Sequence, residues 1–212
     1  MKNNLKNNDK QTQLNEYRKL YLNSDGVFNK LKEIHKDDPF TIENITDKNS
    51  KVCFVFSCPG RAELIAGAPC QGATGDNLNI LLEILNEKFP DLFESKNKDS
   101  YDILNATTRV HFYALDHKTE ASTTEIKNNS NKIKDYLENN KNFEFAIIFG
   151  EKAKKLEELF DEKFIESRHL GFQSINQIKV DEEITDKTRA RLQIVANDIE
   201  KQMLTKKIIS EK

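Results

Sequence analysis

Side chains that can do chemistry follow several short apolar runs of this 212-residue sequence. Ser57 and Cys58 come directly after the run Lys51–Phe56, and a hydroxyl and a thiol are nucleophiles when a neighbouring base activates them. His169 follows a later run and can hold or release a proton near neutral pH. Asn105 follows another run and carries both a hydrogen-bond donor and an acceptor on one amide. These residues are the candidates for a site.

Glycine is scarce except in one stretch, residues 57–76, which we expect to form a loop. The chain has only 7 glycines, about half the average usage, and four of them lie between positions 60 and 75. Glycine lets backbone amides approach a ligand closely, and the N-terminus of a following helix favours an anion. The stretch lacks the GK[ST] of a P-loop and the GxGxxG of a dinucleotide site. It therefore indicates a tight pocket for a flat polar ring or a phosphate.

The elements that must position these residues alternate between strand and helix. Apolar runs predict strands at 51–56, 101–113 (breaking into a loop near 105–108), 143–149 and 164–167. Helical patterns lie at 77–89 (capped by Thr74 or Asp76), 122–137, 151–160 and 184–209, with Ser122-x-x-Glu125 as a capping box. This alternation predicts a three-layer α/β/α fold around a central, mostly parallel sheet of about four strands. In such sheets the site lies at the carboxyl ends of the strands.

The chain reads as a single domain with a polar start. Residues 1–13 are rich in Asn and Lys, and we expect a flexible tail there. Residues 14–50 form an N-terminal helical segment, with apolar spacing over 14–34 divided near 23–26. Residues 51–212 form the α/β domain, which ends in a long helix.

Bulk composition excludes several classes of protein. The formal net charge is −2, so this is no basic coat protein for nucleic acid. The start lacks the apolar region of a signal peptide, and the longest apolar runs are too short to cross a membrane. Three cysteines without a CxxC pair argue against a disulfide framework and against zinc or iron–sulfur sites. We expect a cytoplasmic monomer with reduced thiols, no metal and no cofactor.

Residues 59–78 resemble the first loop of the uracil-DNA glycosylase superfamily, in the families with the pattern PG-x-x-E-x-x-x-G-x-P-F-x-G-x-x-G-x-x-L. The matching positions, in the same spacing and without a gap, are Pro59, Gly60, Glu63, Gly67, Pro69, Gly72, Gly75 and Leu78. Downstream similarities keep the order of the family: Ile103-Leu104-Asn105, Ala146–Ala153 with its strand–Gly–x–x–Ala pattern, and His169. The resemblance covers roughly residues 50–180.

The resemblance implies a protein that hydrolyses the N-glycosidic bond of uracil or a related damaged base in DNA, as in base-excision repair. The base is flipped out of the duplex and read on its polar edge. Asn105 looks like the asparagine that pairs with uracil, and His169 like the histidine that hydrogen-bonds the departing oxygen. The implied catalytic residues are Ser57, Cys58 and His169, and the implied substrate-binding residues are Pro59, Gly60, Cys70, Gln71, Gly72 and Asn105. The implied partners are DNA or a free base or nucleotide.

The sequence departs from the family pattern in three places. Ser57 and Cys58 stand where active relatives usually carry an acidic residue or an asparagine that positions water. Cys70 stands where an aromatic residue should stack on the base, and residues 169–171 read His-Leu-Gly instead of His-Pro-Ser. These changes leave a second hypothesis open, a catalytically inactive protein that binds a base, a nucleotide or a DNA lesion on the same fold.

Several residues also have simple structural interpretations. The buried state common to free cysteine suits Cys58 and Cys70 as packing residues. Glu63 can cap backbone amides within its own loop. His111 and His117 are expected to be ordinary loop residues. Two aromatic candidates for the lost stacking residue are Phe54 and Phe172.

Overall fold

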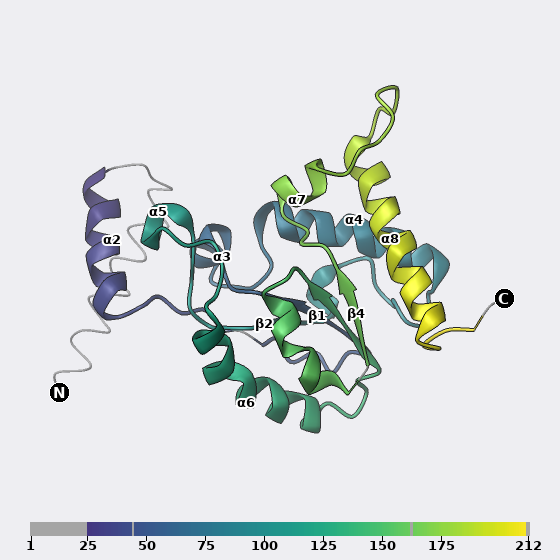
Figure 1. The fold of residues 1–212 in the computed structure, drawn as a ribbon, viewed down its shortest axis with the longest axis horizontal. Helices are drawn as coiled ribbons and strands as arrows, with labels where there is room; N and C mark the ends of the chain where they lie inside the picture. The colour runs from purple at the N-terminus through teal and green to yellow at the C-terminus, as the bar shows by residue number, and fades with distance from the viewer. Residues whose placement is uncertain (1–24, 44, 162, 211–212) are drawn as a thin grey trace.

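A four-stranded sheet, parallel throughout, lies at the centre of the molecule (Figure 1). The structure is a computed structural model that describes residues 25–43, 45–161 and 163–210. The strand order is β2-β1-β3-β4. The strands are β1 (Val52–Phe56), β2 (Asp102–Asn105), β3 (Phe145–Phe149) and β4 (Phe164–Ser167). The predicted parallel sheet of about four strands is confirmed.

Helices cover both faces of this sheet. One face carries α4 (Gly72–Lys88) and α8 (Lys187–Thr205), and the other carries α6 (Thr123–Asn139) and the 3-10 helix η2 (Ala153–Phe160). Alternate strand residues pack into the two layers: Phe54 belongs to the cluster under α4 and α8, and Val55 to the cluster over α6. Every residue of β1 and β3 is buried, as expected for parallel strands covered on both sides. The three-layer α/β/α fold is confirmed.

A smaller apolar cluster joins the helices that precede and follow the first two strands. It contains residues of α2 (Asp25–Asp37), α3 (Arg61–Ala66) and α5 (Tyr113–Asp116), which Figure 1 shows at one end of the molecule. The short elements η1 (Lys98–Ser100) and α7 (Phe172–Asn176) complete the described chain. The predicted tail at 1–13 and the first part of the helical segment from residue 14 lie outside the described residues.

The glycine-rich stretch differs from the prediction, because most of it is helical. Residues 61–66 form α3, and α4 begins at Gly72 with Gln71 as its N-cap, five residues before the predicted start and without a cap from Thr74 or Asp76. Gly75 therefore lies in the first turn of α4. A Cβ atom there would lie 2.3 Å from the carbonyl oxygen of Cys70. This glycine permits close packing of the helix start rather than close approach of a ligand.

The local signal at Ser122 predicted the start of α6 correctly. Ser122 caps α6: its hydroxyl accepts from the Glu125 N–H at 3.3 Å, and the Glu125 carboxylate accepts from the Ser122 N–H at 2.8 Å.

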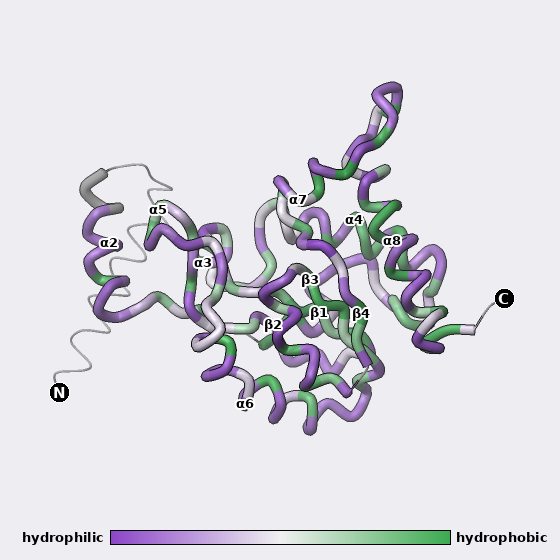
Figure 2. Tube along the Cα trace, in the orientation of Figure 1, coloured by the Kyte–Doolittle hydropathy of each residue, from purple (hydrophilic) through white to green (hydrophobic). Residues whose placement is uncertain are grey.

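The hydropathy map shows hydrophobic residues along the central strands and hydrophilic ones on the loop between α7 and α8 (Figure 2). Across the described part of the chain, no helix is both long and apolar enough to span a membrane.

Candidate functional site

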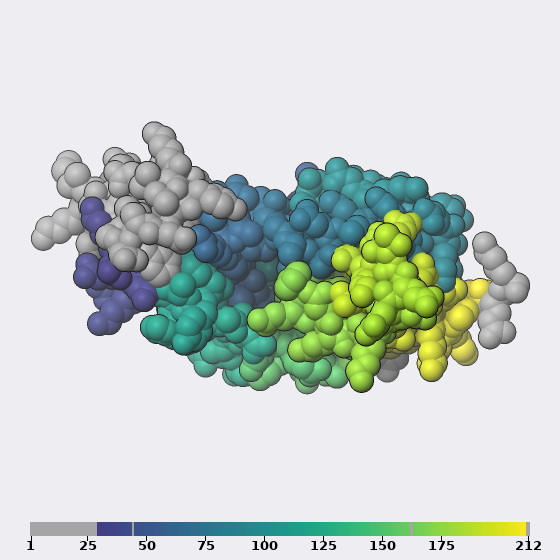
Figure 3. All heavy atoms as spheres, turned by 90° about the horizontal axis from the view of Figure 1, so that it is seen from above, coloured from purple at the N-terminus to yellow at the C-terminus, as the bar shows by residue number. Residues whose placement is uncertain are grey.

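A hollow of about 1070 Å³ opens at the carboxyl ends of β1, β3 and β4. Ser57 and Cys58 enter it from the end of β1, Gly150 from the end of β3, and His169 from the end of β4. Seen from above, the lime-green residues that follow β4 lie at the surface beside the yellow α8, which supplies another wall (Figure 3). The sheet therefore brings the three predicted catalytic residues into one cavity.

Ser57 and Cys58 contact the segment that leads into α6. The Ser57 hydroxyl accepts from the backbone N–H of Ala121 at 3.4 Å, and the Cys58 thiol points at the carbonyl oxygen of Thr119 at 3.9 Å. An amide N–H and a carbonyl oxygen cannot remove a proton from a nucleophile. Burial also raises the pKa of the Cys58 thiol to about 12, so this thiol is protonated at neutral pH. These contacts hold the loop in place and leave both groups unactivated.

His169 is held by one backbone hydrogen bond and by a contact with an aromatic ring. The Gly171 N–H donates to Nδ1 at 2.9 Å, and the ring lies edge-on to Phe56 with 6.3 Å between ring centroids. A Cβ atom on Gly171 would lie 2.8 Å from Nδ1, and one on Gly150 would lie 3.4 Å from the His169 Cβ. Glycine at position 171 makes room for the imidazole, whereas glycine at position 150 is favoured by its φ of +87°.

The surroundings of His169 determine whether its ring is charged and which ring nitrogen carries the proton. The surrounding protein desolvates the partly exposed ring and lowers the pKa of His169, while the charge of Glu120 acts in the opposite direction. The ring is therefore mainly neutral at pH 7. Because Nδ1 accepts a hydrogen bond, the neutral ring carries its proton on Nε2. His169 is thus a hydrogen-bond donor through Nε2.

Asn105 ends β2 but is not among the described residues that line the cavity. It is 2% exposed and aligned with Phe56 in the sheet. Its backbone carbonyl oxygen accepts from the Asn129 side chain at 3.4 Å. The structure thus places Asn105, a predicted substrate-binding residue, in the buried end of β2 and not in the lining of the cavity.

The five predicted binding residues of the first loop also lie outside the lining. The Glu63 carboxylate accepts from the Gly60 N–H at 3.0 Å and from the Gln71 N–H at 3.1 Å, which confirms the interpretation of Glu63 as a cap for its own loop. Cys70 is buried in the core under α4, and burial raises the pKa of its thiol. The other positions are Pro59, whose carbonyl oxygen accepts from the His111 N–H, and Gly72, which starts α4 with φ +61°. These residues build the loop.

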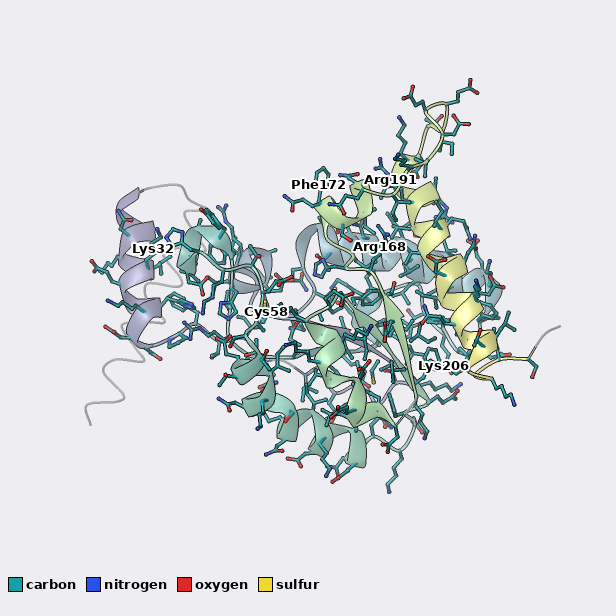
Figure 4. The ribbon with its side chains drawn as sticks, viewed as in Figure 1. Lys32, Cys58, Arg168, Phe172, Arg191 and Lys206 are labelled. Atoms are coloured by element: carbon teal, nitrogen blue, oxygen red, sulfur yellow. The ribbon has the colours of Figure 1, made fainter. Side chains whose placement is uncertain are left out.

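Of the two aromatic candidates, only Phe172 is placed to meet a ligand. It projects from α7 at the surface, lines the cavity and is 70% exposed, and Figure 4 shows it above Arg168. Phe54 is fully buried and packs against Phe149 and Tyr101 in the core. Phe172 is therefore the candidate whose ring a ligand in the cavity can contact.

His111 is the histidine that the sequence misjudged. It is completely buried rather than an ordinary loop residue, and its Nδ1 lies 2.6 Å from the Asp116 carboxylate and its Nε2 3.1 Å from the Glu125 carboxylate. Both ring nitrogens of His111 are therefore within hydrogen-bond distance of a carboxylate, and the ring is held between Asp116 and Glu125. The partners come from elements that the sequence pattern does not relate to each other, which is why spacing alone could not reveal this cluster.

His35 and Arg109 extend the cluster around His111. His35 Nε2 lies 3.7 Å from Asp116, and its Nδ1 accepts from the Phe40 N–H at 3.0 Å. Arg109 Nε lies 3.4 Å from Glu125. Burial raises the pKa of Glu125, but hydrogen bonds from Ser122 and the charges of His111 and Arg109 outweigh it, so the net shift is downward. The cluster ties α2 and α5 to the start of α6.

The described residues contain no group of three or more His, Cys, Asp or Glu side chains arranged to hold a metal ion, and all three cysteines are free thiols. No protein-family model matches the chain, and no curated protein sequence matches it. The chemistry of the cavity must therefore be argued from its residues.

Proposed function

We propose that this protein is a divergent member of the uracil-DNA glycosylase superfamily that hydrolyses the N-glycosidic bond of uracil or a related damaged base in DNA. The observation that carries the proposal is His169. His169 lines the cavity where the ends of β1, β3 and β4 meet, and its neutral imidazole carries its proton on Nε2 because Nδ1 accepts a backbone N–H. Such a donor stabilises negative charge as it develops on the oxygen of a departing base.

The rim of the cavity supplies a surface for the base itself. Phe172 offers an exposed ring on which a flipped base can stack in place of the aromatic that Cys70 replaces. Stacking on an aromatic side chain is worth about 1–3 kcal/mol per base. The cavity holds four lysine or arginine side chains and four carboxylates, listed as Lys152, Arg168, Lys201 and Lys206 against Glu120, Glu151, Glu166 and Asp198. This balance favours one extruded nucleotide over a long phosphate track.

The three cysteines bear on the compartment in which the protein acts. Three free thiols are consistent with a reducing compartment, and we propose that the protein acts in the cytoplasm as a monomer on DNA.

Incubation with defined oligonucleotides tests the proposal. The purified chain, in excess over oligonucleotides that contain uracil, hypoxanthine or xanthine, should produce abasic sites that alkali converts to strand breaks. An oligonucleotide with only normal bases is the control. The absence of alkali-labile product from all three modified substrates at high protein excess would reject the function.

A second candidate function is favoured by the state of Ser57 and Cys58. Neither is activated, and the Cys58 thiol is protonated at neutral pH. A cavity with a donor and an exposed aromatic but no activated nucleophile suits a protein that binds a base, a nucleotide or a DNA lesion without cleaving it. Calorimetric titration distinguishes the two functions: saturable binding without any product would favour the binding protein, whereas turnover excludes it.

A further inference from the structure

Carboxylates line the cavity, although the two residues that follow β1, Ser57 and Cys58, carry none. Glycosidic bond cleavage builds positive charge on the sugar, and a carboxylate nearby stabilises it or activates water. Ser57 and Cys58 provide no such group. The four carboxylates of the cavity come from other segments, namely Glu120, Glu151, Glu166 and Asp198.

Glu120 differs from the other three in the way its segment is held. The chain leaves α5 at His117, whose φ of +58° turns it, and reaches the start of α6 at Ser122. Between these points the carbonyl oxygen of Thr119 lies 3.9 Å from the Cys58 sulfur, and the backbone N–H of Ala121 donates to the Ser57 hydroxyl at 3.4 Å. Both neighbours of Glu120 in the chain are therefore attached to the loop that follows β1.

The carboxylate of Glu120 is close to the cavity residues yet not committed elsewhere. Its partner is Lys152, at 3.7 Å between Oε2 and Nζ, and the Glu120 side chain is 58% exposed. An ion pair this exposed holds its side chains weakly. By contrast, Glu166 forms a 2.6 Å ion pair with Lys154. Glu120 also acts electrostatically on His169, since its charge raises the pKa of that imidazole against the effect of burial.

We propose that Glu120 supplies the carboxylate of the reaction, a role that rests on the glycosidase function proposed above. The oxygen of a water molecule attacks C1′ of the deoxyribose, and the C1′–N bond breaks with its electron pair leaving on the base. Glu120 takes one proton from the water, and the His169 Nε2–H hydrogen-bonds the oxygen of the departing base. The base then takes up a proton from solvent, and Glu120 returns its own proton there.

Replacement of the carboxylate by an amide tests this role in the intact chain. Glu120→Gln should slow single-turnover cleavage of a uracil-containing oligonucleotide by about 100-fold or more, because carboxylate acid–base catalysis contributes about 10²–10⁴-fold. The dissociation constant for that oligonucleotide should stay within threefold. The matched control is Glu138→Gln on α6, which removes a carboxylate that is 64% exposed and 3.9 Å from Lys134. It should cleave at the wild-type rate.

The outcomes separate this role from the function on which it rests. A wild-type chain that produces no abasic sites rejects both. A wild-type chain that cleaves, with Glu120→Gln cleaving at more than a third of its rate, rejects only the role of Glu120, and so does a loss in Glu151→Gln as large as that in Glu120→Gln.

NMR titration of the His169 ring adds a readout that does not depend on cleavage. Glu120→Gln should lower the pKa of His169, because it removes a nearby negative charge, and Glu138→Gln should leave it unchanged. An unchanged His169 titration in Glu120→Gln would place the carboxylate too far from the imidazole for the role proposed.

Discussion

Two histidine sites in this molecule use the same ring in opposite ways. Both ring nitrogens of His111 lie at hydrogen-bond distance from half-buried carboxylates, whereas His169 accepts one backbone N–H at Nδ1 and lines a cavity. The first arrangement gives both ring nitrogens a partner within the protein. The second leaves a directed donor where a ligand can reach it. The two rings therefore differ in how many of their nitrogens are paired within the protein.

The largest expected effect is at His169 and the cavity that it lines, which we call the open site. His169→Ala should lower the single-turnover rate of cleavage by about 10²–10⁴-fold, because it removes the donor that stabilises the departing base. Urea unfolding should show little change in the free energy of unfolding, since the imidazole is partly exposed. A large loss of stability with cleavage retained in the remaining folded protein would reverse the roles assigned to the two histidines.

At the closed site, the cluster of His111 with Asp116 and Glu125, we expect a loss of stability and little change in the cleavage rate. His111→Ala leaves two carboxylates without their buried partner, and the removal of one member of a buried ion pair costs about 3–5 kcal/mol. Chemical denaturation at pH 7 measures this loss. At a temperature where the variant is still folded, its cleavage rate should remain within a few-fold of wild type. A variant as stable as wild type would contradict the structural role assigned to His111.

The third prediction concerns pH and the histidine at the edge of the closed site. Burial, followed by the charge of Arg109, lowers the pKa of His35 to about 4, against the weaker opposing effect of Asp116 and with a further lowering by His111. Because the folded pKa lies below the unfolded value of 6.5, His35 favours folding above pH 6.5, and this contribution is lost as the pH falls from 6.5 towards 4.

Comparison of wild type with His35→Gln isolates this effect. Between pH 7 and pH 4.5 the free energy of unfolding of wild type should fall by about 2 kcal/mol more than that of the variant. Urea titrations of both proteins at the two pH values provide the measurement. Parallel losses in the two proteins would show that His35 takes no part in the acid response.

The smallest effect is expected at the rim of the open site. Phe172→Ala should weaken binding of a uracil-containing oligonucleotide by about 1–3 kcal/mol, because it removes an exposed stacking surface. Phe172→Tyr keeps the ring and should bind within twofold of wild type. Fluorescence anisotropy with a labelled oligonucleotide measures both. Equal affinity of Phe172→Ala and wild type would remove the aromatic from the proposed site.

The sheet could be predicted from the sequence because its signals are local. The runs that became β1 and β3 are continuous and apolar, and the box Ser122–Glu125 marked the start of α6. The predicted start of α4 was wrong because glycine is compatible with both loops and closely packed helix starts. Gly72 and Gly75 indicated a loop, but in the structure they allow a helix to begin against the Cys70 carbonyl.

The site was harder to predict, because its members come from distant segments. The sequence pointed to Ser57, Cys58 and His169, which share the cavity, and also to residues of the first loop that the cavity does not include. Glu120 and the partners of His111 carry no recognisable spacing. Their relation depends on how the segment between α5 and α6 lies against the end of β1, which is a tertiary contact and not a pattern.

The strand order β2-β1-β3-β4 has one more consequence. The chain moves outward in one direction from β1 to β2 and then in the other direction through β3 to β4. After β1 it therefore crosses towards the layer of α4, and after β3 it crosses towards the layer of η2. Two connections that part to opposite sides leave a crevice between the strand ends. This crevice is a product of the chain path, so replacing Ser57 or Cys58 should change what it does without closing it.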